Sequence, residues 1–243
     1  MSKHAMLTAF FTVSFALMCM RCEAGPSKAS DHVFLGRVAG CAEAVNGKII
    51  VAGGMTLSGD VREVGSYDPA TKSWTSCAPI PTPRSAAASA VHGGAMFVIG
   101  GRNDDGVLSS VEKYIVAEDK WESCAPMPTP RWSLMACVVG DTLYAFGGIA
   151  GVGDNRRTLD VVEALDIKNN TWRSLGAMPE GLHSAASAAV DGRIFIISGK
   201  AATYVQSTPT SHRPERVYCF DPIADTWTVV QDIPTDRTGG RAV

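Results

Sequence analysis

The sequence predicts an all-β fold: a β-propeller with four complete four-stranded blades and the first strand of a fifth. Glycine doublets recur 47 residues apart, a Trp follows each doublet, and a short apolar run precedes it. A degraded fourth doublet is Ser198-Gly199. One copy cannot enclose a core, so the copies are expected to stack radially and cover one another's faces. The expected structural positions are Gly53, Gly54, Trp74, Gly100, Gly101, Trp121, Gly147, Gly148, Trp172 and Trp227.

Each copy contains four segments with the composition of strands, in a fixed order. A run of small residues comes first, as in "SAAASAV", and suits a crowded position near a central axis. An apolar run such as "GAMFVIGG" follows and predicts a strand buried on both faces. A strand with an aromatic or Leu residue and a strand with Trp complete the copy. The expected blades are 37–83, 84–130, 131–182 and 183–236 of a domain at 31–243, with 237–243 starting a further blade.

The composition of the N-terminal residues is typical of a targeting segment. Lys3 precedes the uncharged run "AMLTAFFTVSFALMCM", which is short for a membrane-spanning helix. Small residues flank a possible cleavage point after Ala24, so residues 1–24 are expected to be a signal peptide. A signal anchor that stays attached is the alternative. We therefore expect a secreted or extracytoplasmic protein with no other membrane contact; membrane-anchored and cytoplasmic placements stay open.

Several motifs give the repeat a family resemblance. "YDP" occurs at 67–69 and "FDP" at 220–222, and a Trp follows six residues after Asp68 and Asp221. With the glycine doublets and a period of about 50 residues, this pattern resembles the kelch repeat. The resemblance implies a β-propeller in which each copy is one blade. Ile115 replaces the Asp, Ser198 replaces a glycine, and His183 stands where other copies have Arg.

Kelch relatives usually have more than four blades, so the resemblance implies that this chain is part of a larger closed ring. Two alternatives remain. The chain forms a small four-bladed ring, or it forms an open ring that another chain closes.

The sequence offers no recognisable catalytic machinery. The net charge is −2 and no long block of like charges occurs, which argues against a nucleic-acid partner. The histidines lack zinc-motif spacing, and no Gly-x-Ser-x-Gly elbow or phosphate-binding loop is present. We expect no catalytic residues, metal or cofactor. Kelch relatives include a galactose-oxidising copper enzyme, whose ligand set cannot be placed here, and a sialic-acid mutarotase, which remains the alternative function.

Candidate binding residues fall in two groups. The first lies in the unequal polar loops after the doublets, where binding residues tend to occur: Arg102, Asn103 and Arg156. The second lies where each inner strand begins: Arg37, Arg84, Arg131, Arg237 and, at the same place, His183, with Trp132 beside one Arg. These arginines have two interpretations. They hydrogen-bond the carbonyl groups of a neighbouring blade, or they bind acidic segments, as the resemblance to kelch adaptor proteins implies.

The predicted function is a non-catalytic kelch-repeat scaffold that binds a protein segment or a glycan on one loop face. The oligomeric state stays open. Cys77 and Cys124 recur three residues after Trp, where other copies have Leu175 and Val230. A position that accepts Cys, Leu or Val is apolar, so these thiols are expected to pack beside Trp rather than to form a redox or metal site.

Overall fold

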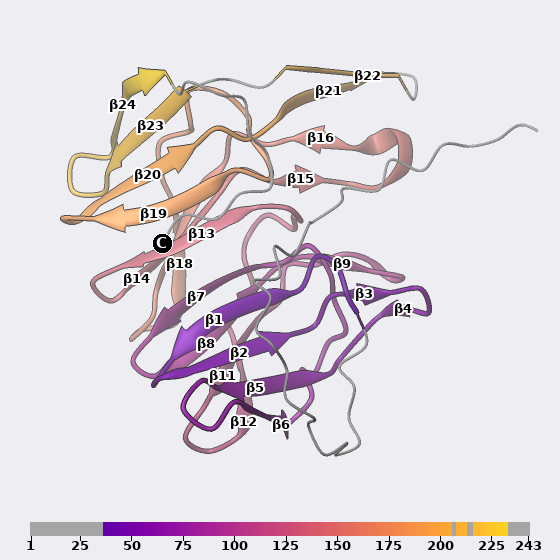
Figure 1. Cartoon of the computed structure of the whole chain (residues 1–243). Coiled ribbons are helices and arrows are strands. Elements are labelled where there is room, and N and C mark those ends of the chain that lie inside the picture. Colours follow the sequence, from indigo (N-terminus) through magenta and orange to yellow (C-terminus); the bar gives the residue numbers. More distant parts are fainter. Residues whose placement is uncertain (1–35, 206–207, 213–215, 233–243) are drawn as a thin grey trace, which may run out of the picture. The chain divides into compact units, whose positions relative to one another are not determined.

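The structure is a computed structural model that describes residues 36–205, 208–212 and 216–232. Four antiparallel four-stranded sheets form the blades (Figure 1). Blade 1 has the order β1 (Cys41–Val45), β2 (Lys48–Ala52), β5 (Val64–Asp68) and β6 (Ser73–Cys77). Blade 2 has β7 (Ala88–His92), β8 (Ala95–Ile99), β11 (Val111–Ile115) and β12 (Lys120–Cys124). The strand order predicted for each copy is confirmed.

The third and fourth blades repeat this order. Blade 3 has β13 (Met135–Val139), β14 (Thr142–Phe146), β17 (Val162–Asp166) and β18 (Thr171–Ser174). Blade 4 has β19 (Ala186–Val190), β20 (Arg193–Ile197), β23 (Arg216–Asp221) and β24 (Thr226–Asp232). The predicted signal segment 1–24 and the predicted start of a fifth blade at 237–243 lie outside the described residues.

The variable loops carry two-stranded ribbons, which the sequence did not predict. One ribbon joins the second and third strands of each blade: β3 (Met55–Thr56) with β4 (Gly59–Asp60), β9 (Arg102–Asn103) with β10 (Gly106–Val107), β15 (Ile149–Ala150) with β16 (Arg157–Thr158), and β21 (Ala201–Val205) with β22 (Thr208–His212). A 3-10 turn, η1 (Gly153–Asn155), tips the third ribbon. The ribbons gather at one end of the sheets, on the right of Figure 1, which we call the ribbon face.

Each pair of adjacent blades shares one apolar core. Between blades 1 and 2, Ile50 of β2 packs with Met96 and Val98 of β8. Equivalent clusters join blade 2 to blade 3 and blade 3 to blade 4. Cys77 packs against the cluster between blades 1 and 2, and Cys124 packs against the cluster between blades 2 and 3. Each therefore lies in an apolar environment, but the Trp at the same cluster is that of the following blade, Trp121 or Trp172, rather than the Trp three residues earlier. The second strands of blades 2 and 3, β8 and β14, are buried on both faces because each of these blades lies between two described blades.

Backbone hydrogen bonds link the beginnings of successive inner strands. The N–H of Ala86 donates to the carbonyl of Ala39, Ser133 donates to Ala86, and Ser184 donates to Ser133, at 2.7 to 2.9 Å. All four residues have φ between 51° and 55°, a left-handed conformation that side chains disfavour. A second link uses the doublets. The N–H of Gly101 donates to the carbonyl of Arg131 in the next blade at 3.0 Å, and Gly54 and Gly148 make the same contact.

Each Trp fixes a blade to the blade before it. The indole N–H of Trp172 donates to the carbonyl of Ala125 at 2.8 Å, and Asn170 Oδ1 accepts the N–H of the same Ala125 at 2.8 Å. We call this two-point contact the clasp. Trp121 with Asp119 and Trp227 with Asp225 hold Ala78 and Gly176 in the same way. The acceptor residue, two positions before Trp, was not singled out from the sequence.

Replacing Asn170 with Gly is expected to lower the free energy of unfolding by about 1 kcal/mol, because the backbone N–H of Ala125 loses its acceptor. Gly adopts the left-handed conformation of this position (φ 53°) without strain, so the effect reports the hydrogen bond. Urea denaturation measures the change. The exposed neighbouring Lys168→Ala variant serves as control and should unfold like the parent. An Asn170→Gly midpoint equal to that of the control would contradict a stabilising clasp.

Candidate functional site

Arg84 and Arg131 lie inside the blades rather than at their surface. Arg84 is 1% exposed, and its Nη1 donates to the carbonyls of Gly100 at 2.8 Å and Ser110 at 3.0 Å. Its Nη2 lies 2.9 Å from a carboxylate oxygen of Glu112. The other Glu112 oxygen accepts a hydrogen bond from the Thr82 hydroxyl at 2.7 Å. The Arg84 guanidinium therefore contacts groups of its own blade, whereas the backbone carbonyl of Arg84 accepts a hydrogen bond from Gly54 of the preceding blade.

Blade 3 repeats this cluster. Arg131 is fully buried and lies 3.0 Å from Glu163, which also accepts from the Thr129 hydroxyl at 2.7 Å. Burial lowers the pKa of Arg131 to about 10, and the charge of Glu163 opposes this shift. Burial likewise lowers the pKa of Arg84. Both guanidinium groups remain protonated at neutral pH, and each balances a buried carboxylate.

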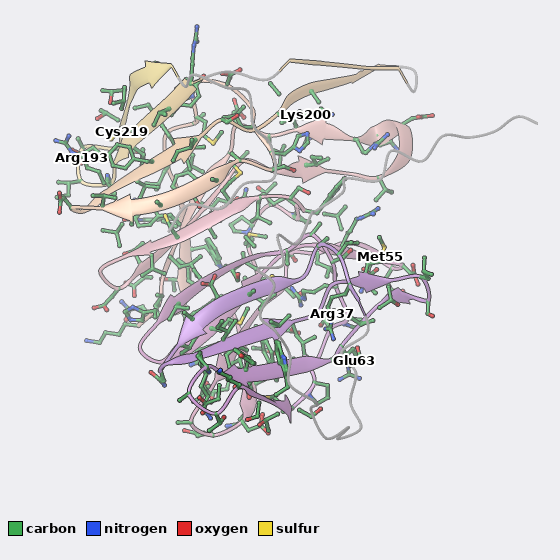
Figure 2. All side chains as sticks on the ribbon, in the orientation of Figure 1. Arg37, Met55, Glu63, Arg193, Lys200 and Cys219 are labelled. Atoms are coloured by element: carbon green, nitrogen blue, oxygen red, sulfur yellow. The ribbon has the colours of Figure 1, made fainter. Side chains whose placement is uncertain are left out.

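Arg37 uses the same backbone anchors but is more exposed. Its Nη1 donates to the carbonyls of Gly53 at 3.0 Å and Glu63 at 2.9 Å, and Figure 2 shows Arg37 beside Glu63. Gly65 takes the strand position that Glu112 has in blade 2, so blade 1 has no buried carboxylate there. Arg37 therefore differs from Arg84 in both burial and pairing.

The prediction that His183 takes the place of the arginine in blade 4 is wrong by one residue. The carbonyl of Leu182 accepts from Gly148, as the carbonyl of Arg131 accepts from Gly101. His183 instead forms the isolated bridge that Trp132 forms in blade 3. Leu182 and Tyr218 replace the Arg and Glu of the buried pair, and the Tyr218 hydroxyl donates to Glu180 where blades 2 and 3 have Thr. Blade 4 thus has the neutral side chains of Leu182 and Tyr218 in place of the buried ion pair, and a carboxylate, that of Glu180, in place of the Thr hydroxyl.

His183 is buried, and its Nδ1 lies 3.0 Å from the Ser184 hydroxyl. Burial lowers the pKa of His183 to about 4, with a smaller contribution from Lys200. Figure 2 places Lys200 where β20 leads toward β21. His183 is therefore neutral at physiological pH, and its role as a charged ligand-binding group is not supported by this environment.

Arg102 and Trp132 are brought together on the ribbon face. The guanidinium carbon of Arg102, in the ribbon of blade 2, lies 4.9 Å from the centre of the Trp132 ring of blade 3. The Trp132 indole N–H donates to the carbonyl of Gly151 at 3.2 Å, which fixes the ring. Both side chains are partly exposed. Among the predicted binding residues, this pair joins two blades and keeps a cation and an aromatic surface in reach of solvent.

Two of the remaining predicted residues, Asn103 and Arg156, bond groups of their own blade, and the third lies outside the described residues. Asn103 donates to the carbonyl of Pro83 at 3.1 Å and accepts from the N–H of Asp105, so it shapes its ribbon. Arg156 donates from Nε to the carbonyl of Gly153 at 2.8 Å. Arg237 lies outside the described residues.

Within the described residues, no group of three or more His, Cys, Asp or Glu side chains could hold a metal ion. The described cysteines, Cys41, Cys77, Cys124, Cys137 and Cys219, are free thiols. No helix within the described part of the chain is both long enough and apolar enough to cross a membrane.

Comparison with known families agrees with this architecture. A sequence model of the KLHDC2/KLHL20/DRC7 Kelch-repeats domain matches residues 17–148 and residues 78–243. Kelch-like protein 35 of Mus musculus is 33% identical over 81 residues, which form 33% of this chain and 13% of that protein. Kelch-like protein terF of Aspergillus terreus is 32% identical over 93 residues, 37% of this chain and 19% of that protein. The matched segments therefore span less than a fifth of these curated relatives.

The likeness extends to solved structures. The structure of YjhT superposes with a TM-score of 0.75 at 16% sequence identity, covering 84% of this chain and 73% of that one. At this identity the likeness concerns the fold alone.

Proposed function

Because the chain belongs to the kelch-repeat proteins, we propose that it is a non-catalytic binding scaffold whose ribbon face holds a carboxylate-bearing ligand, most simply an acidic protein segment. The observation that carries this proposal is the Arg102–Trp132 pair. Arg84 and Arg131 are buried inside the blades and each pairs with a glutamate of its own blade, whereas Arg102 stays partly exposed. A guanidinium stacked on an aromatic ring is oriented in advance, so less side-chain entropy is lost when a carboxylate binds.

The surroundings of the pair favour an extended ligand. The ribbons of blades 3 and 4 touch, since the Thr158 hydroxyl donates to the carbonyl of Ala202 at 2.9 Å. The ribbons of blade 2 and blade 3 are linked by the contact of Arg102 with Trp132, which leads into the ribbon of blade 3. Arg156 and Lys200 add basic side chains to the same face. A segment with one acidic residue at Arg102 and an apolar residue on Trp132 would use both properties of the pair.

The test uses the full chain on arrays of acidic peptides, with matched peptides in which Asn and Gln replace Asp and Glu. Arrays of sialylated and neutral glycans run in parallel to identify a sugar carboxylate. Arg102→Ala and Trp132→Ala are each expected to weaken binding of the acidic probe at least about tenfold, which corresponds to about 1.4 kcal/mol.

Arg193→Ala is the matched control, because Arg193 is exposed and Figure 2 places it at the end of the sheets away from the ribbons. It should bind the acidic probe like the parent. Equal binding by Arg102→Ala and the parent, or equal binding of acidic and neutral peptides, would overturn the proposal. Binding confined to sialylated glycans would replace the protein segment with a glycan.

A further inference from the structure

The turn between β17 and β18 in blade 3 carries a sequence that no other blade has. Residues 169–171 read Asn-Asn-Thr, the acceptor pattern for N-linked glycans, in which any residue except Pro separates an Asn from a Ser or Thr. No other asparagine in the sequence has Ser or Thr two positions later. The chain therefore offers one position at which this modification could occur.

The fold accounts for the second residue of this pattern but not for the first. Asn170 is the acceptor of the clasp. The backbone N–H of Asn169 donates to Asp166 Oδ1 at 2.9 Å, and the residues at its position in blades 1 and 4 make the same backbone bond to Asp68 and Asp221. The other copies have at this position Thr71, Glu118 and Ala224. The turn therefore forms without an asparagine there.

The surroundings of Asn169 leave room for a sugar. Asn169 and Thr171 are both exposed. Asn169 Nδ2 donates to Asp166 Oδ2 at 2.8 Å, and the backbone and side-chain hydrogen bonds from Asn169 lower the pKa of Asp166. An asparagine amide has two hydrogens, and glycosylation replaces one of them. The hydrogen that remains can still donate to the Asp166 carboxylate, so the turn keeps its contacts.

The turn also lies away from the ribbon face. The ribbon of blade 3 leads into the first residue of β17, whereas the turn follows the last one. Five residues of extended strand separate the two ends by about 16 Å. A glycan on the turn would therefore leave the Arg102–Trp132 pair accessible.

We propose that Asn169 accepts an N-linked glycan when the chain enters the secretory pathway. The donor is an oligosaccharide carried on a lipid diphosphate. A bond forms between Asn169 Nδ2 and the first carbon of the sugar, the bond from that carbon to the diphosphate oxygen breaks, and the lipid diphosphate leaves while Nδ2 gives up one proton. The inference rests on the expectation that residues 1–24 direct export, and it does not depend on the ribbon-face ligand.

The full chain, produced in cultured mammalian cells with its own N-terminus, tests the proposal. The exported chain is expected to lose mass on treatment with peptide-N-glycosidase. This enzyme converts the amide of a glycosylated asparagine to a carboxyl group, and peptide mass spectrometry should locate that change at Asn169. Asn169→Gln and Thr171→Ala should each abolish the modification, whereas Thr171→Ser should retain it because Ser also completes the pattern.

Asn170→Gly is the matched control, because it removes the clasp acceptor but leaves the glycan acceptor pattern intact. It should be glycosylated like the parent. A second version of the full chain carries an established secretory signal in front of Met1 and separates export from acceptance of the sugar. An unmodified Asn169 in either version, once exported, overturns the proposal. A parent that stays in the cytosol also overturns it, because that chain never meets the donor.

Discussion

Glu163→Gln is expected to lower the free energy of unfolding by about 3–5 kcal/mol, because the fully buried Arg131 would lose the charge that balances it. Thr129 would also lose its charged acceptor. Urea denaturation measures the loss. Glu122→Gln is the control, since Glu122 pairs with Lys113 at 2.8 Å near the surface, where such pairs contribute about 0–1 kcal/mol.

A triple substitution separates loss of the pair from damage to the fold. Thr129→Glu, Arg131→Leu and Glu163→Tyr together install in blade 3 the residues that blade 4 uses: Glu180, Leu182 and Tyr218. The two fully buried charges at 131 and 163 would be replaced by neutral side chains, and the new carboxylate would stand at the partly exposed position of Thr129. Replacing a buried ion pair by packed neutral groups is often neutral or stabilising. The triple variant should therefore recover most of the stability that Glu163→Gln loses. If the triple variant is no more stable than Glu163→Gln, the two clusters are not interchangeable.

The sequence predicted the fold well because the repeat fixes strand order through local composition. Short apolar runs, turn glycines and Trp each act within one copy, and their spacing repeats. The role of Arg84 and Arg131 was harder to predict, because it depends on Glu112 and Glu163, which lie far along the chain from their partners. The sequence did contain a correlated pattern: the two copies with Thr-Pro-Arg at the start of the blade also have Glu directly after the recurring Val, and blade 4 has neither.

Two other features could not be predicted by comparing the four copies. Leu182 and His183 are adjacent in the sequence, and only the backbone contacts show that Leu182 takes the position of the arginine. The alignment was ambiguous because "EGLH" retains neither Thr nor Arg. The proximity of Arg102 to Trp132 depends on how two blades pack, which no pattern within one copy reveals. The acceptor two residues before Trp, by contrast, could have been found from Asp119, Asn170 and Asp225.

Gly147→Ala is expected to be among the most damaging single methyl additions in this chain. A Cβ at Gly147 would lie 2.2 Å from the carbonyl oxygen of Leu182 in the next blade. That oxygen accepts the Gly148 N–H at 2.8 Å, so it cannot move without breaking an inter-blade hydrogen bond. The backbone at Gly147, with φ 52°, adds strain for any L-residue. Together these effects should lower the free energy of unfolding by about 3 kcal/mol or more.

Gly153→Ala distinguishes the steric effect from the conformational one. Gly153 has φ 57°, almost the value of Gly147, but nothing lies within 4 Å of a Cβ added there. Its substitution should cost only about 1 kcal/mol, the strain of the left-handed conformation. Hydrogen exchange adds a local readout, because Gly147→Ala should speed exchange of the Gly148 N–H, whereas Gly153→Ala should not. Equal losses for the two variants would mean that the doublet is required for backbone conformation alone, and that the close approach of neighbouring blades is not what selects glycine.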